Sequence, residues 1–408
     1  MSDTLFPSLT GNWRLTLLFI ALSGLTPGAA AAENWDIGGS VGAELRAFPH
    51  SPRYADQRSG AQGTLLLKPE LRYRSPDRRH LVRIAPNIRL DSRDAERHLA
   101  DLTELVWTWA DGDREIVAGI NKVFWGVAES RHLVDIVNQT DLADDLDGEE
   151  KLGQPMISFA TQRDWGRISA FALPGFRERN FAGRNGRLRA PLPVDTDHPE
   201  YQSGARERHV DLALRYTHYF GDWDIGAAVF RGTGREPRLR INDTGTALIP
   251  VYEQITQFGA DLQYTREAWL WKFEGIVRSG QGDTFAATVA GFEYTLYQLG
   301  DTAADLGLLF EYLYDGRDRD APVTIYDNDV FAGARLALND MQDTSLLTGA
   351  VIDMGDGSAL FSVEAERRLG DRWKVELESR WPVNTADRNP LHGVTDDAYL
   401  SFRLSRYF

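Results

Sequence analysis

Apolar and polar residues alternate one by one over many short segments of this 408-residue chain. The stretch "GTLLLKPELRYRS" shows the pattern, with one face apolar and the other charged: Leu65, Leu67, Leu71 and Tyr73 against Lys68, Glu70, Arg72 and Arg74. The two-residue period recurs in "HLVRIAPNIRL", "LTELVWTWA", "FGADLQYT", "WKVELESRW" and several other segments, and no long stripe of helical period accompanies it. Since successive side chains of a strand point to opposite faces, this pattern predicts an all-β fold.

The last segment, "DDAYLSFRLSRYF", keeps this alternation up to the terminal Phe408. The ends of soluble domains usually fray and carry small or charged residues. In a lipid bilayer, an unpaired strand edge would leave backbone groups unsatisfied at a cost of several kcal/mol each. We therefore expect the last strand to pair with the first, "NWDIGGSVGAELRAF", and to close a barrel.

Residues 1–32 have the pattern of a secretory signal peptide, with Arg14, a short apolar run from Leu15 to Leu25 and an Ala30-x-Ala32 cleavage site. The remaining chain has no cysteine and no apolar run long enough for a transmembrane helix. The full 408-residue chain combines a mean hydropathy of −0.37 with 11 Trp, 14 Tyr and 19 Phe. A membrane β-barrel has this composition because its lumen face is polar. The net charge of −15 argues against a nucleic-acid partner.

Short and long connections alternate between the predicted strands, as in barrels with short periplasmic turns and longer surface loops. We expect one domain over residues 33–408, a transmembrane antiparallel β-barrel of about eighteen strands with sixteen as the main alternative. A soluble β-sandwich is the competing fold, because a period of two does not distinguish it from a barrel. The expected location is the bacterial outer membrane, in contact with membrane lipid and lipopolysaccharide.

The C-terminal segment resembles the assembly signal of Gram-negative outer-membrane proteins, which ends in an aromatic residue after alternating apolar residues. The resemblance implies that Phe402, Leu404 and Phe408 are recognised by the barrel-assembly machinery. A barrel of this width is of porin size and would hold an aqueous lumen. The segment 118–141, with its Trp-Gly…Val-Asp-x-Val-Asn pattern, also resembles a poorly characterised proteobacterial outer-membrane barrel family. Some members of that family are encoded near lipid-exporting efflux pumps.

In porins the third surface loop folds into the lumen and faces basic residues on the wall. The connection 125–155 takes this place here and contains an acidic run. The resemblance implies an acidic lip of Asp141, Asp144, Asp145 and Asp147 opposite a basic wall of Lys68, Arg72, Arg74, Arg83 and Arg89. Fixed charges of opposite sign across a narrow gap would orient polar solutes. A solvated acidic loop outside the membrane is the simpler alternative.

Two further hypotheses concern the same connection, residues 125–155. Residues 129–146 read as one or two helical turns, with Val134, Val137, Leu142 and Leu146 packed on the wall. A calcium site is the other hypothesis, because Asp141, Asp144, Asp145, Asp147 and Glu149 offer carboxylate oxygens. Their spacing does not match the EF-hand loop, and charge runs are usually solvated.

We expect a passive channel for small hydrophilic solutes without a cofactor, and a homotrimer follows from the resemblance to porins. Ser130 and His132 lack the pattern that surrounds a catalytic pair, so we do not expect an enzyme. One alternative is a barrel that exports lipid or a hydrophobic substrate with a periplasmic partner. The other is a plugged structural or adhesin-like barrel.

Overall fold

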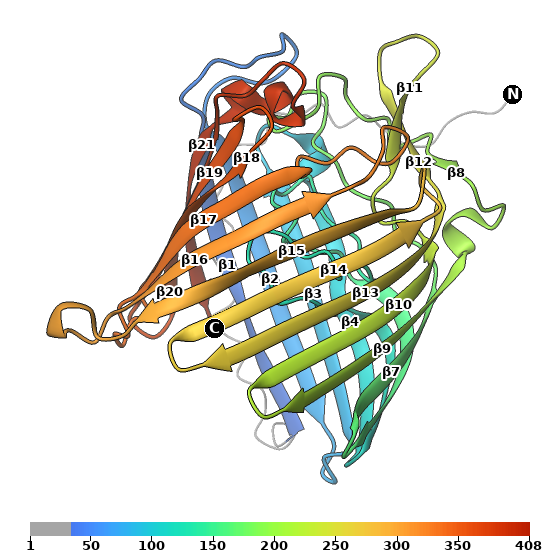
Figure 1. Cartoon of the computed structure of the whole chain (residues 1–408), viewed down its shortest axis with the longest axis vertical. Coiled ribbons are helices and arrows are strands. Elements are labelled where there is room, and N and C mark those ends of the chain that lie inside the picture. Colours follow the sequence, from blue (N-terminus) through green and yellow to red (C-terminus); the bar gives the residue numbers. More distant parts are fainter. Residues whose placement is uncertain (1–33) are drawn as a thin grey trace, which may run out of the picture.

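The computed structural model describes residues 34–408, so the predicted signal peptide lies outside the described residues. Eighteen antiparallel strands form one closed sheet (Figure 1). The last strand, β21 (Tyr399–Tyr407), pairs with β1 (Trp35–Ala47) from Leu400 opposite Ala47 to Tyr407 opposite Ser40. The predicted barrel and its strand number are confirmed, and both the sixteen-strand count and the soluble sandwich are wrong.

Long strands joined at one end by short turns make up the wall. Between β1 and β21, in chain order, the wall contains β2 (Gln62–Arg74), β3 (His80–Asp91), β4 (Leu99–Asp111), β5 (Arg114–Asn121), β6 (Gln154–Arg163), β7 (Gly166–Pro174), β9 (Val210–Phe220), β10 (Trp223–Thr233), β13 (Gln254–Arg266), β14 (Trp269–Ser279), β15 (Phe285–Leu296), β16 (Asp305–Asp315), β17 (Asn328–Ala337), β18 (Ser345–Asp353), β19 (Ala359–Leu369) and β20 (Trp373–Val383). Outside the wall, β8 (Glu200–Tyr201), β11 (Arg238–Ile241) and β12 (Leu248–Tyr252) form a small sheet. The 3₁₀ helices are η2 (Ala95–Arg97), η3 (Arg206–Arg208), η4 (Leu299–Asp301) and η5 (Pro390–Asp397).

The two faces of the wall differ as the alternation predicts. On β21, Leu400 and Phe402 are 51% and 44% exposed on the outside, whereas Tyr399 and Ser401 are buried on the inside. Beside the short turns, neighbouring strands pair aromatic rings in an outer belt: Trp35 with Tyr73, Trp223 with Tyr264 and Trp269 with Tyr294. An apolar band ending in aromatic residues is the surface that lipid requires. Within the described residues, no helix has both the length and the apolar character to cross a bilayer.

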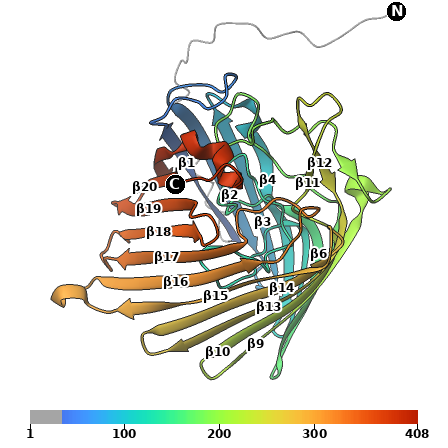
Figure 2. The ribbon, with the colours of Figure 1, turned by 45° about the horizontal axis from the view of Figure 1, so that its top comes forward.

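Chain segments fold into the barrel (Figure 2). The hydrophobic core lies between these segments and the wall. The main segment is the inward loop, which we define as residues 122–153 between β5 and β6. Its residues Trp125, Leu133, Val134, Ile136 and Val137 are buried against inward side chains of strands from β6 to β17. Burial of these residues fixes the first half of the inward loop on one side of the lumen.

The predicted helical turns in residues 129–146 are wrong, because the inward loop is irregular chain with single turns. The backbone N–H groups of residues 127–130 bond to carboxylates of the wall instead of to carbonyl groups of a helix. Val134 and Val137 do pack on the wall, whereas Leu142 and Leu146 are only partly buried and lie outside the core.

Candidate functional site: the inward loop and the charged wall

Glu274, in the middle of β14, is the first anchor of the inward loop. Its carboxylate is fully buried and accepts backbone N–H groups from Val127, Ala128 and Val134 at 2.7, 2.9 and 3.2 Å. Gly126 has a φ of +137°, and a Cβ there would come within 2.7 Å of the Glu274 Oε1 atom. A glycine is therefore needed where the loop backbone closes on this carboxylate.

Glu311, on β16, is the second anchor. It accepts the backbone N–H groups of Glu129 and Ser130 at 2.7 and 2.8 Å, and the Ser130 hydroxyl as well. One residue further along the loop, Arg131 pairs with Asp315 at 2.9 Å. Hydrogen bonds to a charged, buried acceptor are stronger than neutral ones, so these contacts hold the loop tightly.

The acidic run of the loop reaches the other side of the ring. Arg89, on β3, pairs with Asp141 at 2.9 Å and with Asp144 at 3.0 Å. Arg97 pairs with Asp144 at 3.1 Å, and Arg46 donates to the Asp144 carbonyl group at 3.1 Å. All three arginines are buried, so a buried cation meets each of these acids.

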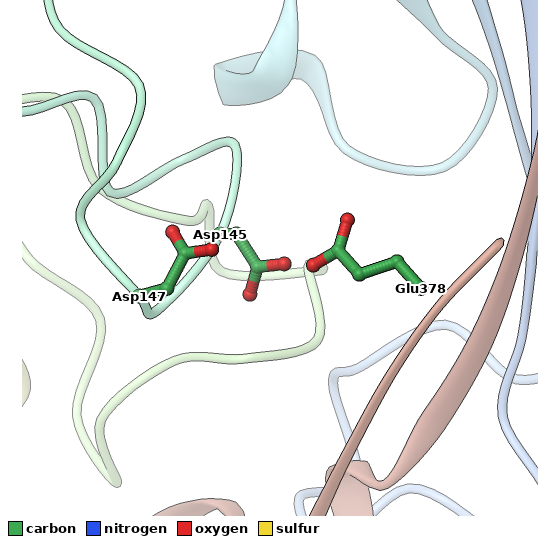
Figure 3. Close-up of side chains that lie close together, drawn as sticks. All are labelled: Asp145, Asp147 and Glu378. Carbon is green, nitrogen blue, oxygen red and sulfur yellow. The ribbon is translucent and has the colours of Figure 1, made fainter. Parts of the chain in front are cut away.

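The next acids of the run meet β20 and β21 (Figure 3). Carboxylate oxygens of Asp145, Asp147 and Glu378 lie within 4.8 Å of one another. Arg380 pairs with Asp147 at 2.8 Å and with Glu378 at 3.4 Å. The Tyr399 hydroxyl lies within hydrogen-bond distance of both Asp145 and Glu378, the latter at 2.7 Å, and can donate to either carboxylate. A cation and a hydroxyl thus bind together three acids that would otherwise repel one another.

Of the five residues predicted for the basic wall, only Arg89 contacts the acidic run. The other four lie lower on the wall, toward the short turns, and are Lys68, Arg72, Arg74 and Arg83. Arg72 pairs with Glu70, and Arg83 pairs with Glu70 at 2.6 Å and with Glu104 at 2.8 Å. No ion pair of Lys68 or Arg74 occurs within residues 34–408.

Arg46, Arg97 and Arg380 are the cations that the sequence reasoning missed. Arg46 and Arg380 stand on the polar faces of period-two segments, so the alternation could have identified them as lumen residues. Arg97 lies in η2 within a surface connection, where no periodic signal marks it.

Calcium binding by the acidic run stays a prediction. In this structure each of its five proposed ligands has a partner: Arg89 for Asp141 and Asp144, Tyr399 for Asp145, Arg380 for Asp147 and His132 for Glu149. A second set of three carboxylates, Asp327, Asp329 and Asp353, lies at the surface ends of β17 and β18. Guanidinium partners occupy oxygens that a calcium ion would need.

Two groups of the inward loop have shifted pKa values. Burial lowers the pKa of His132, but the carboxylates of Glu149 at 3.2 Å and Glu274 at 4.0 Å raise it to about 10. Burial and the charge of Asp145 raise the pKa of Asp147 above its usual value, against the opposing charge of Arg380. Both groups therefore hold a proton more readily when the loop is docked.

Comparisons with known proteins show the fold but no family. No family model matches the sequence, and no curated protein matches it either. Wzi, an outer-membrane, carbohydrate-binding β-barrel of Escherichia coli involved in group 1 capsule assembly, has 8% identity and a TM-score of 0.51, over 90% of this chain and 84% of its own. A BenF-like porin from Pseudomonas fluorescens has 7% identity and a TM-score of 0.51, over 92% and 97% of the two chains. Pseudomonas aeruginosa OpdQ has 11% identity and a TM-score of 0.51, over 92% of this chain and 98% of its own.

The first prediction concerns the anchor at Glu274. Glu274→Gln keeps the shape but replaces charged acceptors by a neutral one, so loop docking should weaken by about 1–3 kcal/mol. Hydrogen–deuterium exchange of residues 123–137 should become faster. Glu376→Gln, a lumen carboxylate that is 30% exposed and does not touch the loop, is the matched control. Equal exchange in the two variants would contradict the anchoring role.

The second prediction concerns pH. The raised pKa of His132 stabilises the docked loop below pH 6.5, and this contribution is lost as the pH rises toward 10. The raised pKa of Asp147 also makes the docked loop less stable as the pH rises, because docking favours the protonated form of this carboxyl group. Loop exchange, corrected for the intrinsic rate, should therefore be slower at about pH 6 than at about pH 8. His132→Gln should reduce this difference, and an unchanged or reversed difference would exclude His132 as its source.

Proposed function

We propose that the protein is a porin-type channel of the bacterial outer membrane for small hydrophilic solutes, with a lumen narrowed by the inward loop. An apolar outer face, a polar inner face and closure of the last strand on the first support insertion in lipid. Likeness in fold to solved barrels that include a porin is consistent with this proposal.

The observation that carries the proposal is the span of the inward loop. It is anchored to Glu274 on β14 and to Arg89 on β3. In the closed ring, seven strands separate β3 from β14 on one side and nine on the other, so the two anchors stand nearly opposite each other. A loop that crosses the lumen in this way narrows the passage that is left for solutes.

The lumen wall carries accessible charges of both signs. The side chains of Arg72 and Arg83 are 49% and 33% exposed, and that of Glu364 is 49% exposed. A wet, mixed-sign wall admits polar solutes and disfavours apolar ones. We also propose that the N-terminal segment directs export of the protein and that the C-terminal signal directs assembly of the barrel. The assembled protein is a homotrimer without enzymatic activity.

The third prediction is a conductance measurement in planar lipid bilayers. The intact protein should form small, steady channels, because the loop fills much of the cross-section. Replacement of residues 139–151 by a short Gly-Ser linker should raise single-channel conductance several-fold. Replacement of residues 242–246, which lie between β11 and β12 and are mostly exposed, by a Gly-Ser linker is the control. Absence of conductance in both the intact and the loop-replaced protein would overturn the channel proposal.

A further inference from the structure

Phe124 is a large apolar side chain that is exposed inside the lumen. It belongs to the inward loop and is 59% exposed. Most of the other large apolar side chains with such exposure in residues 34–408 lie on the outer face of strands or in connections at the barrel ends. Phe258 on β13 and Tyr297 after β15 are examples. Contact of an apolar ring with water costs free energy, and a solute that covers the ring recovers it.

The contacts of neighbouring loop residues place the Phe124 ring within the barrel. Trp125 is buried against Phe171 on the inner face of β7, with 5.6 Å between the ring centroids. Two residues after Phe124, Gly126 lies against the Glu274 carboxylate on β14. The loop backbone is therefore inside the ring of strands on both sides of these contacts. The exposed face of Phe124 meets the part of the lumen that the loop leaves open.

A carboxylate stands beside this ring. The Phe124 ring packs edge-on against His132, with 4.7 Å between the centroids and an interplanar angle of 84°. On its other side, the His132 Nε2 atom lies 3.2 Å from the Oε1 atom of Glu149. The Glu149 side chain is 58% exposed, and its Oε2 atom has no hydrogen-bond donor or cation among residues 34–408. Because both groups adjoin the same imidazole and both are exposed, ring and carboxylate border one open space.

The exposed charges near the ring are mainly acidic. Arg380 joins Asp147 of the acidic run to Glu364 on β19, at 2.8 and 2.7 Å. The Glu364 side chain is 49% exposed, whereas those of Arg380 and His132 are only 7% and 17% exposed. Arg335 on β17 is 39% exposed but pairs with two carboxylates of its own. A solute beside the loop therefore meets free carboxylate oxygens more readily than free cations.

An aromatic face next to a free carboxylate favours one class of solute. The quadrupole of the ring attracts a cation, and the carboxylate attracts the same charge. An anion would be repelled by the exposed acids, and a neutral apolar solute would gain nothing from them. An ammonium group that carries small alkyl groups fits both parts, because its alkyl groups cover the ring while its charge faces the carboxylate.

We propose that Phe124 and Glu149 form a binding site for small organic cations on the wall of the passage. The ring contacts the alkyl groups around the charged nitrogen, and the free oxygen of Glu149 faces that charge. Glu364 adds a second exposed negative charge nearby. The inference rests on the channel function proposed above, because it takes the open side of the inward loop as the solute passage.

The fourth prediction is a binding measurement on the folded barrel in detergent micelles. The probe is tetramethylammonium, and tert-butanol and pivalate are neutral and anionic controls of similar size. Saturation-transfer NMR of the methyl protons should show saturable binding of tetramethylammonium, and several-fold weaker binding of the two controls. Phe124→Leu keeps an apolar side chain without a π face and should weaken tetramethylammonium binding several-fold. Phe124→Trp should retain or strengthen it, because the indole ring is the best partner for a cation.

Two matched variants separate the site from general effects. Tyr297→Leu removes a ring that is also 59% exposed but lies in the turn after β15, so binding should stay unchanged. Glu149→Gln should weaken tetramethylammonium binding several-fold. Glu366→Gln removes the same charge from a lumen carboxylate that is 42% exposed and pairs with Lys374, and it should leave binding nearly unchanged.

Equal binding of the three probes to the wild type would overturn the site, and so would equal tetramethylammonium binding by Phe124→Leu and the wild type. If Phe124→Leu does not fold, Glu149→Gln decides the case, because binding equal to that of Glu366→Gln would contradict the proposal. The measurement needs no ion current. A protein that conducts ions but does not bind the probe would therefore contradict the site alone, and a protein that binds it without conducting would contradict the channel alone.

Discussion

Buried carboxylates on the inner wall determine how the lumen is filled. Glu274 and Glu311 stand in the middle of strands whose own backbone groups are already paired, so each must find hydrogen-bond donors elsewhere. The inward loop supplies these donors from its backbone. The requirement is reciprocal, because a loop inside a barrel also needs partners for its N–H groups. The wall carboxylates and the loop N–H groups therefore provide each other with hydrogen-bond partners. The loop consequently takes an irregular path instead of a helical one.

Charge pairing completes the same arrangement on the far side of the ring. Arg89 and Arg380 project from β3 and β20 into the lumen and would be costly to bury alone. The acidic run of the loop neutralises them and is neutralised in turn. The apolar contacts around Val134 and Val137 hold one half of the loop, and these ion pairs hold the other half. The result is a crossing element with a fixed path, attached at both sides of a rigid cylinder.

The outer face and the closure of the barrel could be predicted from the sequence, because they follow from a local period of two. Leu400 and Phe402 are examples, and their exposure depends only on strand alternation. The partners inside the lumen could not be predicted, because they depend on which strand stands opposite which. Lys68 and Arg83 looked equivalent to Arg89 in sequence, yet only Arg89 lies high enough on the wall to meet the acidic run.

The most direct test of the account is whether the acidic run lies against β20 inside the lumen. The chain has no cysteine, so a pair of cysteines can be introduced at Asp147 and Glu378 without interference. In intact outer membranes, a short thiol-specific cross-linker should join the two efficiently, and a pair at Asp243 and Glu378 should not react. Absence of the first cross-link, or equal cross-linking of the two pairs, would contradict a loop docked across the lumen.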